Sequence, residues 1–484
     1  MKTQVLLAAL ISCSLYVSAQ SQWFHKKAIV STGKGSSNEI FVDTTANSVN
    51  EKSKIPLEGM DFTWVNGGDR RDSSLISGKF FTPLVMVDAN YTHSFNNPID
   101  NTVVGSTALA RNNEVQVSSA NLGSDFYYKG ARAHIVTQFG TRSTVIPRND
   151  LSPYRGQYSL WDVYRYLAEA NAGYHINKWY GINIDMGMFM SYIGLNSYYQ
   201  VENWEYQASY TSDNTPWFFN GIRIQIFPTK YLKIEPWIVN GWQSYAMFNN
   251  TPGFGGNITW QPREWLKMLT NDYYGHDAQG APGRARFHTD NSILARYYNR
   301  PKSKGISKMA FSLTVDYGFE RGDGVDGMVN SPIKGPQQYF FSAMFYNRIW
   351  FAKNKFAWVV GGGTINNPGR YLVLAPTGDA SPFPNSYNPT SAAGTHPFTE
   401  NPGDQFLGWD CSTNLSWLPN KNVEFRIEAV RRHASVPYFA GSGGVTSPTG
   451  LTTTAFGPGT AYPNWQPDLV KDEFRVIFAV LFRL

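Results

Sequence analysis

Few residues of this 484-residue chain have the types and spacing that catalysis or metal binding requires. The 8 histidines are scattered, and no His-Glu-x-x-His motif places two zinc ligands on one helical face. Residues 33–37 lack the glycine spacing of a phosphate-binding loop, and residues 439–444 indicate a flexible loop, not a hydrolase nucleophile turn. Asp323 and Asp326 could bind calcium, but such a pair is more typical of a solvated turn. We therefore predict no enzyme activity, no catalytic residue, no metal site and no cofactor.

The charged residues follow a different pattern, because they recur on one side of alternating segments. From 164 to 174 the even positions are all tyrosine or alanine, whereas odd positions include Arg165, Glu169 and Asn171. A Lys or Arg on the lipid face of a membrane barrel costs about 2–4 kcal/mol at the bilayer midplane, so this confinement indicates a wet interior. The same parity argument gives the candidate pore-lining residues Arg132, His134, Arg165, Glu169, Asp185, Arg223, Lys233, Glu235, Arg296, Asp316, Arg348, Glu424, Arg426, Glu428 and Arg432.

These candidates could act in two ways. Facing rings of opposite charge could produce a transverse field that selects solutes. Alternatively, the groups pair across strands and only fill or stiffen the interior. Their positive and negative charges nearly cancel, and the net charge of the whole chain is only +6. The sequence therefore predicts no preference for anions or cations.

Alternation with a period of two residues dominates the chain after residue 80. Every even position is apolar in 182–190 and again in 474–480, which is typical of strands with one apolar and one polar face. Short polar turns then alternate strictly with long irregular stretches. The turns lie at 129–130, 177–178, 228–230, 262–264, 300–302, 353–355 and 419–421, and the long loops at 96–112, 141–160, 194–216, 244–254, 275–291, 321–336, 366–404 and 437–469.

This rhythm requires about sixteen strands and is typical of an outer-membrane barrel with short periplasmic turns and long extracellular loops. A closed barrel pairs every backbone polar group inside the bilayer and leaves no strand edge. The predicted fold class is therefore all-β, a transmembrane antiparallel β-barrel.

The composition excludes two other classes. A chain that is 15% aromatic and 16% charged is not disordered, and no apolar run reaches the ~18–20 residues of a spanning helix.

Several short motifs in the middle of the chain carry a family resemblance. They are Tyr192-Ile193-Gly194-Leu195, Glu202-Asn203-Trp204, the stretch from Asn214 to Gly221, and Ile238-Val239-Asn240-Gly241-Trp242. Together they resemble the OmpL-like family of β-barrel porins, in the form seen in Bacteroidetes outer membranes. The resemblance covers most of the chain from about residue 80. It implies an outer-membrane barrel that admits small solutes, and it assigns no catalytic roles.

The chain divides into three predicted parts. Residues 1–19 are a secretory signal peptide, with Lys2, an apolar stretch and Val17-Ser18-Ala19 as the cleavage site; lipoprotein cleavage before Cys13 is the alternative. Residues 20–80 are an irregular periplasmic segment, with a plug or pore-entrance element as an alternative. Residues 81–484 form the barrel. The predicted location is the outer membrane of a Gram-negative bacterium.

The predicted function is passive diffusion of small hydrophilic solutes through a water-filled lumen. One alternative is a barrel with a blocked lumen whose long loops act in adhesion, ligand binding or catalysis. The other is an exported soluble β-sandwich that binds carbohydrate through its aromatic residues. The expected partners are outer-membrane lipid, the solutes, the barrel-assembly machinery during biogenesis and further copies of the chain. Nucleic acid is not expected, because Lys and Arg do not cluster.

Overall fold

The computed structural model describes residues 54–71, 76–147, 157–158, 160–247, 249–277, 282–322, 339–368, 371, 405–451 and 467–484. Within these residues, no helix is both long enough and apolar enough to cross a bilayer. The helices are short: α2 (Arg142–Val145), α3 (Leu160–Tyr164), η2 (Gln200–Glu202) and η3 (Ser212–Asn214).

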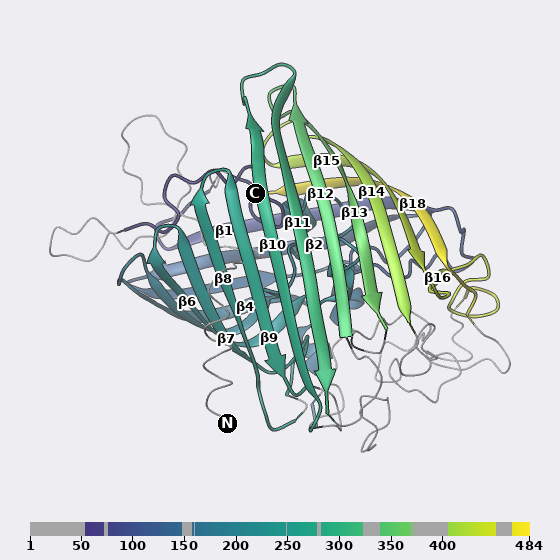
Figure 1. The fold of residues 1–484 in the computed structure, drawn as a ribbon, viewed down its shortest axis with the longest axis horizontal. Coiled ribbons are helices and arrows are strands. Elements are labelled where there is room, and N and C mark those ends of the chain that lie inside the picture. The colour runs from purple at the N-terminus through teal and green to yellow at the C-terminus, as the bar shows by residue number, and fades with distance from the viewer. Residues whose placement is uncertain are drawn as a thin grey trace.

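Sixteen antiparallel strands form one closed barrel, in which each strand pairs with its neighbours along the chain and β1 closes the ring against β18 (Figure 1). The strands are β1 (Phe81–Ser94), β2 (Val115–Tyr128), β3 (Ala131–Thr137), β4 (Leu167–Ile176), β5 (Ile182–Met190), β6 (Phe218–Thr229), β7 (Leu232–Val239), β8 (Gly253–Arg263), β9 (Leu266–Gly275), β10 (Ala285–Asn299), β11 (Ile306–Arg321), β12 (Tyr339–Phe351), β13 (Phe356–Asn367), β14 (Phe406–Trp417), β15 (Val423–Ala434) and β18 (Asp472–Arg483). A separate two-stranded sheet pairs β16 (Phe439–Ala440) with β17 (Leu469–Val470). The predicted fold class is confirmed.

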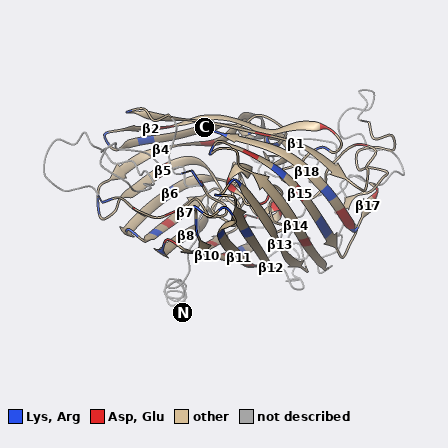
Figure 2. Ribbon diagram, turned by 90° about the horizontal axis from the view of Figure 1, so that it is seen from above, with Lys and Arg blue, Asp and Glu red and all other residues tan. Residues whose placement is uncertain are grey.

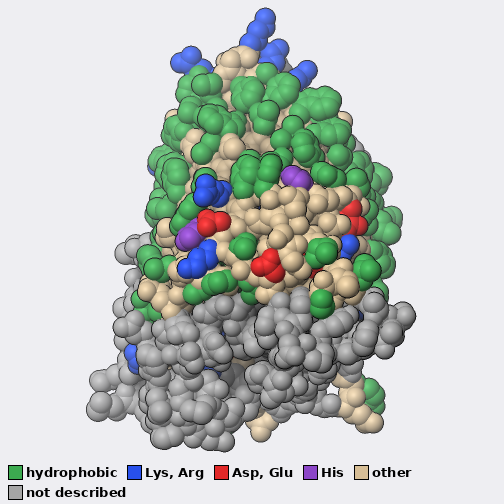
Figure 3. All heavy atoms as spheres, turned by 90° about the vertical axis from the view of Figure 1, so that its right-hand side faces the viewer, with side chains coloured by type: hydrophobic (Ala, Val, Ile, Leu, Met, Phe, Trp, Pro, Cys, Tyr) green, Lys and Arg blue, Asp and Glu red, His purple; other side chains and the backbone are tan. Residues whose placement is uncertain are grey.

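Burial alternates along the strands because their side chains point in turn to the two faces of the barrel. In β14, Asp410 and Asn414 are buried on the inner face, whereas Leu407 and Leu415 are exposed on the outer face. Figure 3 shows hydrophobic side chains gathered over much of one outer face, with Lys and Arg at its top edge. An apolar outer face suits lipid, and the closed ladder satisfies the backbone within it.

Two of the strands predicted between the short turns and the long loops differ from the structure by five or more residues at one end. The strand expected at 292–298 is β10, which begins seven residues earlier, at Ala285. Its first part carries Arg286, His288 and Asp290 on the inner face, so the sequence there is polar enough to look like a loop. The strand expected at 162–176 begins only at Leu167, because the preceding residues form α3.

The core of the molecule lies inside the barrel and is built by two segments that enter it. One is residues 54–71, and the other is residues 191–217, which connect β5 to β6. Trp64 and Val65 of the first segment and Trp204 and Tyr210 of the second belong to one buried apolar cluster with Trp350 of β12. We call these two stretches the N-terminal strap and the inner loop.

Candidate functional site: the charged inner wall

Lys, Arg, Asp and Glu residues recur along the strands of the barrel (Figure 2), and those on the inner face form local ion pairs between strands. Asp185 of β5 forms an ion pair with Arg132 of β3, with 3.1 Å between Nε and Oδ1, and accepts a hydrogen bond from Arg223 of β6, with 3.0 Å between Nη2 and Oδ2. Each carboxylate oxygen therefore faces a different guanidinium. The pairing holds two positive side chains on the wall with one negative charge between them.

Two further pairs among the predicted residues lie on the same part of the wall. His134 of β3 has its Nε2 3.5 Å from Glu169 of β4 and its Nδ1 2.8 Å from Asp125 of β2. Lys233 and Glu235 lie two residues apart on β7, with 2.6 Å between Nζ and Oε2. The structure therefore brings these predicted residues together in pairs.

Glu424 of β15 forms ion pairs with three arginines. Its Oε1 lies 3.1 Å from Nη2 of Arg348 and 3.0 Å from Nε of Arg426. Its Oε2 lies 3.3 Å from Nη2 of Arg70, which belongs to the strap. Arg426 also donates to the backbone oxygens of Gln200, Asn203 and Glu205 in the inner loop. One carboxylate thus connects the wall directly to the strap, and Arg426 extends the connection to the inner loop.

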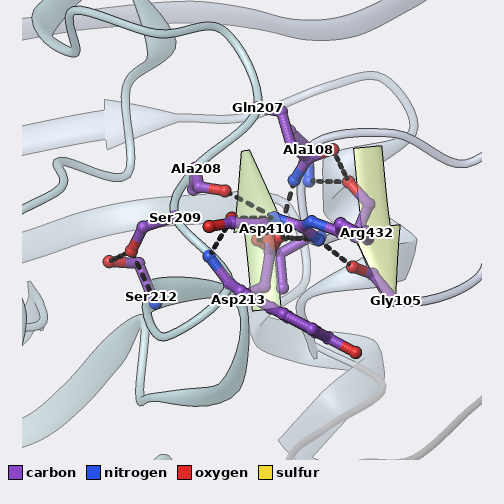
Figure 4. Close-up of polar contacts among 12 residues, drawn as sticks. Gly105, Ala108, Gln207, Ala208, Ser209, Ser212, Asp213, Asp410 and Arg432 are labelled. Carbon is purple, nitrogen blue, oxygen red and sulfur yellow. Dashed lines mark hydrogen bonds and ion pairs between the residues drawn. The ribbon is translucent and has the colours of Figure 1, made fainter. Parts of the chain in front are cut away.

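Residues nearer the long loops hold the other end of the inner loop. Glu428 accepts the backbone N–H groups of Tyr206, at 2.5 Å, and Gln207, at 2.8 Å. Arg432 pairs with Asp213 at 2.7 Å and donates to the oxygen of Ala208 at 2.8 Å (Figure 4). The inner loop is therefore fixed by charged groups of one strand, β15, along much of its length.

The remaining predicted residues lie in three different settings. Asp316 of β11 is fully buried, 3.4 Å from Nε2 of His288. Arg296 of β10 pairs with Asp61 of the strap and lies 3.4 Å from Glu264. Arg165 lies outside the strands, between α3 and β4, with its guanidinium 4.7 Å from the centroid of the half-exposed Tyr166 ring. It therefore differs from the other fourteen candidates, which all lie in strands.

Several inner-wall residues were not among the predicted set. Arg483 of β18 pairs with Asp69 of the strap at 3.2 Å and with Glu202 of the inner loop at 2.7 Å. Arg475 of the same strand pairs with Glu473. The alternation that was recognised in 474–480 places both arginines on the polar face, so the sequence contained the signal that identifies them.

Burial perturbs the acidic residues of the inner loop. Burial raises the pKa of Glu205 to about 7, against a hydrogen bond from Asn196 that lowers it. Burial also raises the pKa of Glu202, although Arg483 lowers it.

Within the described residues, no group of three or more His, Cys, Asp or Glu side chains could hold a metal ion. Residues 323–327, with the calcium-type pattern, lie outside that part of the chain.

A closed sixteen-stranded barrel with an apolar outer face and a charged inner wall defines a porin-like outer-membrane β-barrel. The chain belongs to the family described as "Putative beta-barrel porin-2, OmpL-like", whose model matches residues 85–458. This confirms the resemblance to the OmpL-like family that was found in the sequence, while the Bacteroidetes form of the family stays a prediction. No protein with a curated description matches the chain.

Solved structures of several outer-membrane proteins are similar in fold. The outer membrane channel DcaP of Acinetobacter baumannii has a TM-score of 0.47 and 9% identity, covering 85% of this chain and 100% of that one. An anion-selective porin from Comamonas acidovorans has a TM-score of 0.44 and 8% identity, covering 84% and 99%. OprD of Pseudomonas aeruginosa has a TM-score of 0.35 and 11% identity, covering 85% and 99%.

Proposed function

We propose that this protein is a porin through which small hydrophilic solutes diffuse passively across the outer membrane. The observation that carries the proposal is the inner face itself, where charged and amide side chains recur on most strands around the ring. No cofactor and no covalent chemistry are needed, because the solutes move down their own gradient. The fourteen predicted residues that lie in strands line the path, and their pairs set its local charge.

Water is needed inside this barrel to satisfy its polar groups. The hydroxyls of Ser312 and Ser342 and one carboxylate oxygen of Asp316 are buried without a hydrogen-bond partner among the described residues. A buried polar group left unsatisfied costs about 1–3 kcal/mol, so water is the natural partner for these atoms. Polar groups of this kind on the inner face suit the proposed passage of hydrophilic solutes.

The remaining parts of the proposal concern export and assembly. Residues 1–19 direct the chain across the inner membrane as a cleaved signal peptide, and the barrel-assembly machinery inserts it into the outer membrane of a Gram-negative bacterium. Lipid contacts the apolar outer face. Association of several copies is compatible with this arrangement.

One observation favours a second candidate function. Trp64 of the strap and Trp204 of the inner loop are both completely buried inside the barrel. Segments packed this tightly could block the lumen, and the protein would then act through its long loops in ligand binding or adhesion.

Single-channel recording separates these two functions. The full chain, extracted from outer membranes in mild detergent, is inserted into a planar lipid bilayer in potassium chloride. Stepwise openings whose size rises with salt concentration are expected for a porin. Silence from protein that shows the heat-dependent gel mobility of a folded barrel would reject passive diffusion and leave the loop function.

A further inference from the structure

Four positive side chains form a continuous patch on the inner wall near the short turns. Lys267, Arg296, Lys308 and Arg348 lie on the consecutive strands β9, β10, β11 and β12, each within three residues of the short-turn end of its strand. All four are buried. The carboxylates outside these strands that approach them are Glu264 of the adjoining turn, 3.4 Å from Arg296, and Glu424 of β15, 3.1 Å from Arg348. We call this patch the basic arc.

Strand pairing places the members of the arc next to one another. Ala310 lies opposite Arg296 on one side and opposite Arg348 on the other, so the two arginines flank it. Lys308 is two residues from Ala310, and Lys267 lies opposite Leu294, two residues from Arg296. Neighbouring strands are about 4.8 Å apart, so these like charges repel one another and favour an anion between them.

The strap covers the arc with three consecutive residues. Asp61 pairs with Arg296, the Phe62 ring lies 6.0 Å from Nζ of Lys267, and Thr63 accepts a hydrogen bond from Lys308 at 2.5 Å. Burial raises the pKa of Asp61. The charge of Lys308, two hydrogen bonds from Thr63 and the charge of Arg296 together lower the pKa by more than burial raises it, so it lies below its usual value. Asp61 is therefore a carboxylate at the arc.

The strap is held by side-chain packing and ion pairs and not by strand pairing, because Trp64 and Val65 belong to the buried core cluster and Arg70 pairs with Glu424. It is not a strand of the barrel, so its departure breaks no ladder between strands. The Asp61 side chain remains 24% exposed, whereas that of Arg296 is 5% exposed. Solvent can therefore reach the carboxylate side of the pair.

We propose that the basic arc is the anion site of the channel, that Asp61 occupies it in place of a small carboxylate solute, and that release of the strap opens a path that prefers anions. This inference rests on the proposed porin function. Acidic groups elsewhere on the inner wall, such as Glu169 and Asp185, explain why the summed charge of the wall conceals the preference.

The first experiment weakens the strap in the full chain. Asp61→Asn removes the carboxylate that pairs with Arg296, and Thr63→Val removes the acceptor for Lys308, so each variant weakens the attachment of the strap to the arc. Losing one charge-assisted hydrogen bond between the strap and the arc should raise the fraction of time that the channel is open by roughly tenfold. Glu58→Gln is the matched control, because Glu58 is an exposed acid of the same segment. It should behave as the unmodified protein does.

The second experiment tests the arc itself. Lys267→Gln and Lys308→Gln are combined in the Asp61→Asn chain, and reversal potentials are measured in a gradient of potassium chloride and then of potassium acetate. The Asp61→Asn chain should favour chloride and acetate over potassium, and the lysine substitutions should abolish that preference. Lys302→Gln, at an exposed position of the neighbouring short turn, should retain it.

The outcomes distinguish this inference from the function on which it rests. If every variant is folded but none conducts, the porin function fails, and the inference fails with it. If the channels conduct but Asp61→Asn and Thr63→Val have the occupancy of the unmodified protein, the strap is not a gate. If the lysine substitutions leave the reversal potential unchanged, the arc is not the anion site. Either of the last two results overturns the inference alone.

Discussion

Trp204 of the inner loop meets Trp350 of β12 edge to face, with 5.7 Å between ring centroids and 86° between ring planes. The Trp204 indole N–H also donates to the backbone oxygen of Val65 in the strap, at 3.1 Å. One side chain therefore joins the loop, the strap and the barrel wall. Edge-to-face pairs of this kind contribute beyond the area that they bury.

Trp204→Ala should loosen both internal segments at once. Removing a buried Trp side chain costs about 3–5 kcal/mol, so we expect a lower urea midpoint for unfolding and a larger single-channel conductance. Trp265→Ala is the control, because Trp265 is exposed at a short turn and should change neither quantity. A Trp204→Ala protein with unchanged conductance would mean that the inner loop does not narrow the path.

Glu205 should make the stability of the barrel depend on pH near neutrality. Burial raises its pKa to about 7, and the nearby charge of Glu428 adds to this, against the hydrogen bond from Asn196 and the charge of Arg426. Because the pKa in the folded state exceeds the unfolded value of about 4.3, its stabilising contribution is complete below that value and is lost as pH rises through about 7.

The measurement is the urea midpoint of the folded barrel at pH 5 and at pH 8. The unmodified protein should be less stable at pH 8, by a few kcal/mol at most for a shift of this size. Glu205→Gln keeps the side-chain shape without the titrating group, so its midpoint should vary less between the two pH values. Equal pH dependence in both proteins would assign the effect to another group.

Arg432 should be far more sensitive to substitution than its neighbour on the same strand. Arg432 is buried against Asp213 and Asp410, and removing one partner of a buried ion pair costs about 3–5 kcal/mol. We expect Arg432→Gln to expose the inner loop to protease and to lower the urea midpoint. Arg431→Gln is the control, since the Arg431 side chain is 59% exposed on the outer face. Similar losses in both variants would argue against the inner-loop contact.

The sequence predicted the wall better than it predicted what lies inside it. A strand pattern is local, so Glu424, Arg426 and Glu428 could be placed on one face by counting alternate residues of one segment. The contacts of the strap are not local. Asp61 and Arg296 are 235 residues apart in the chain, and no periodicity links them.

The boundary of β10 shows a second limit of local patterns. A wet inner wall allows a strand to be polar, and the first half of β10 has the composition of a loop. Hydrophobic alternation identifies a strand only where one face is continuously apolar. The sequence therefore shows the lipid-facing part of a barrel more clearly than strand ends that extend beyond it.

The outer face provides a test of membrane depth that uses one strand and one residue type. Phe478 lies near the middle of β18 and is exposed on the outer face, whereas Phe482 lies at the short-turn end of the same strand. A Lys on the lipid face costs about 2–4 kcal/mol at the midplane and about 0–1 kcal/mol near an interface. Phe478→Lys should therefore reduce folding into lipid vesicles much more than Phe482→Lys. The measurement is the urea dependence of folding for purified chains, which removes any effect of the cellular assembly machinery. Equal losses would mean that the two positions lie at the same depth, and the membrane would then have to be placed differently along the barrel axis.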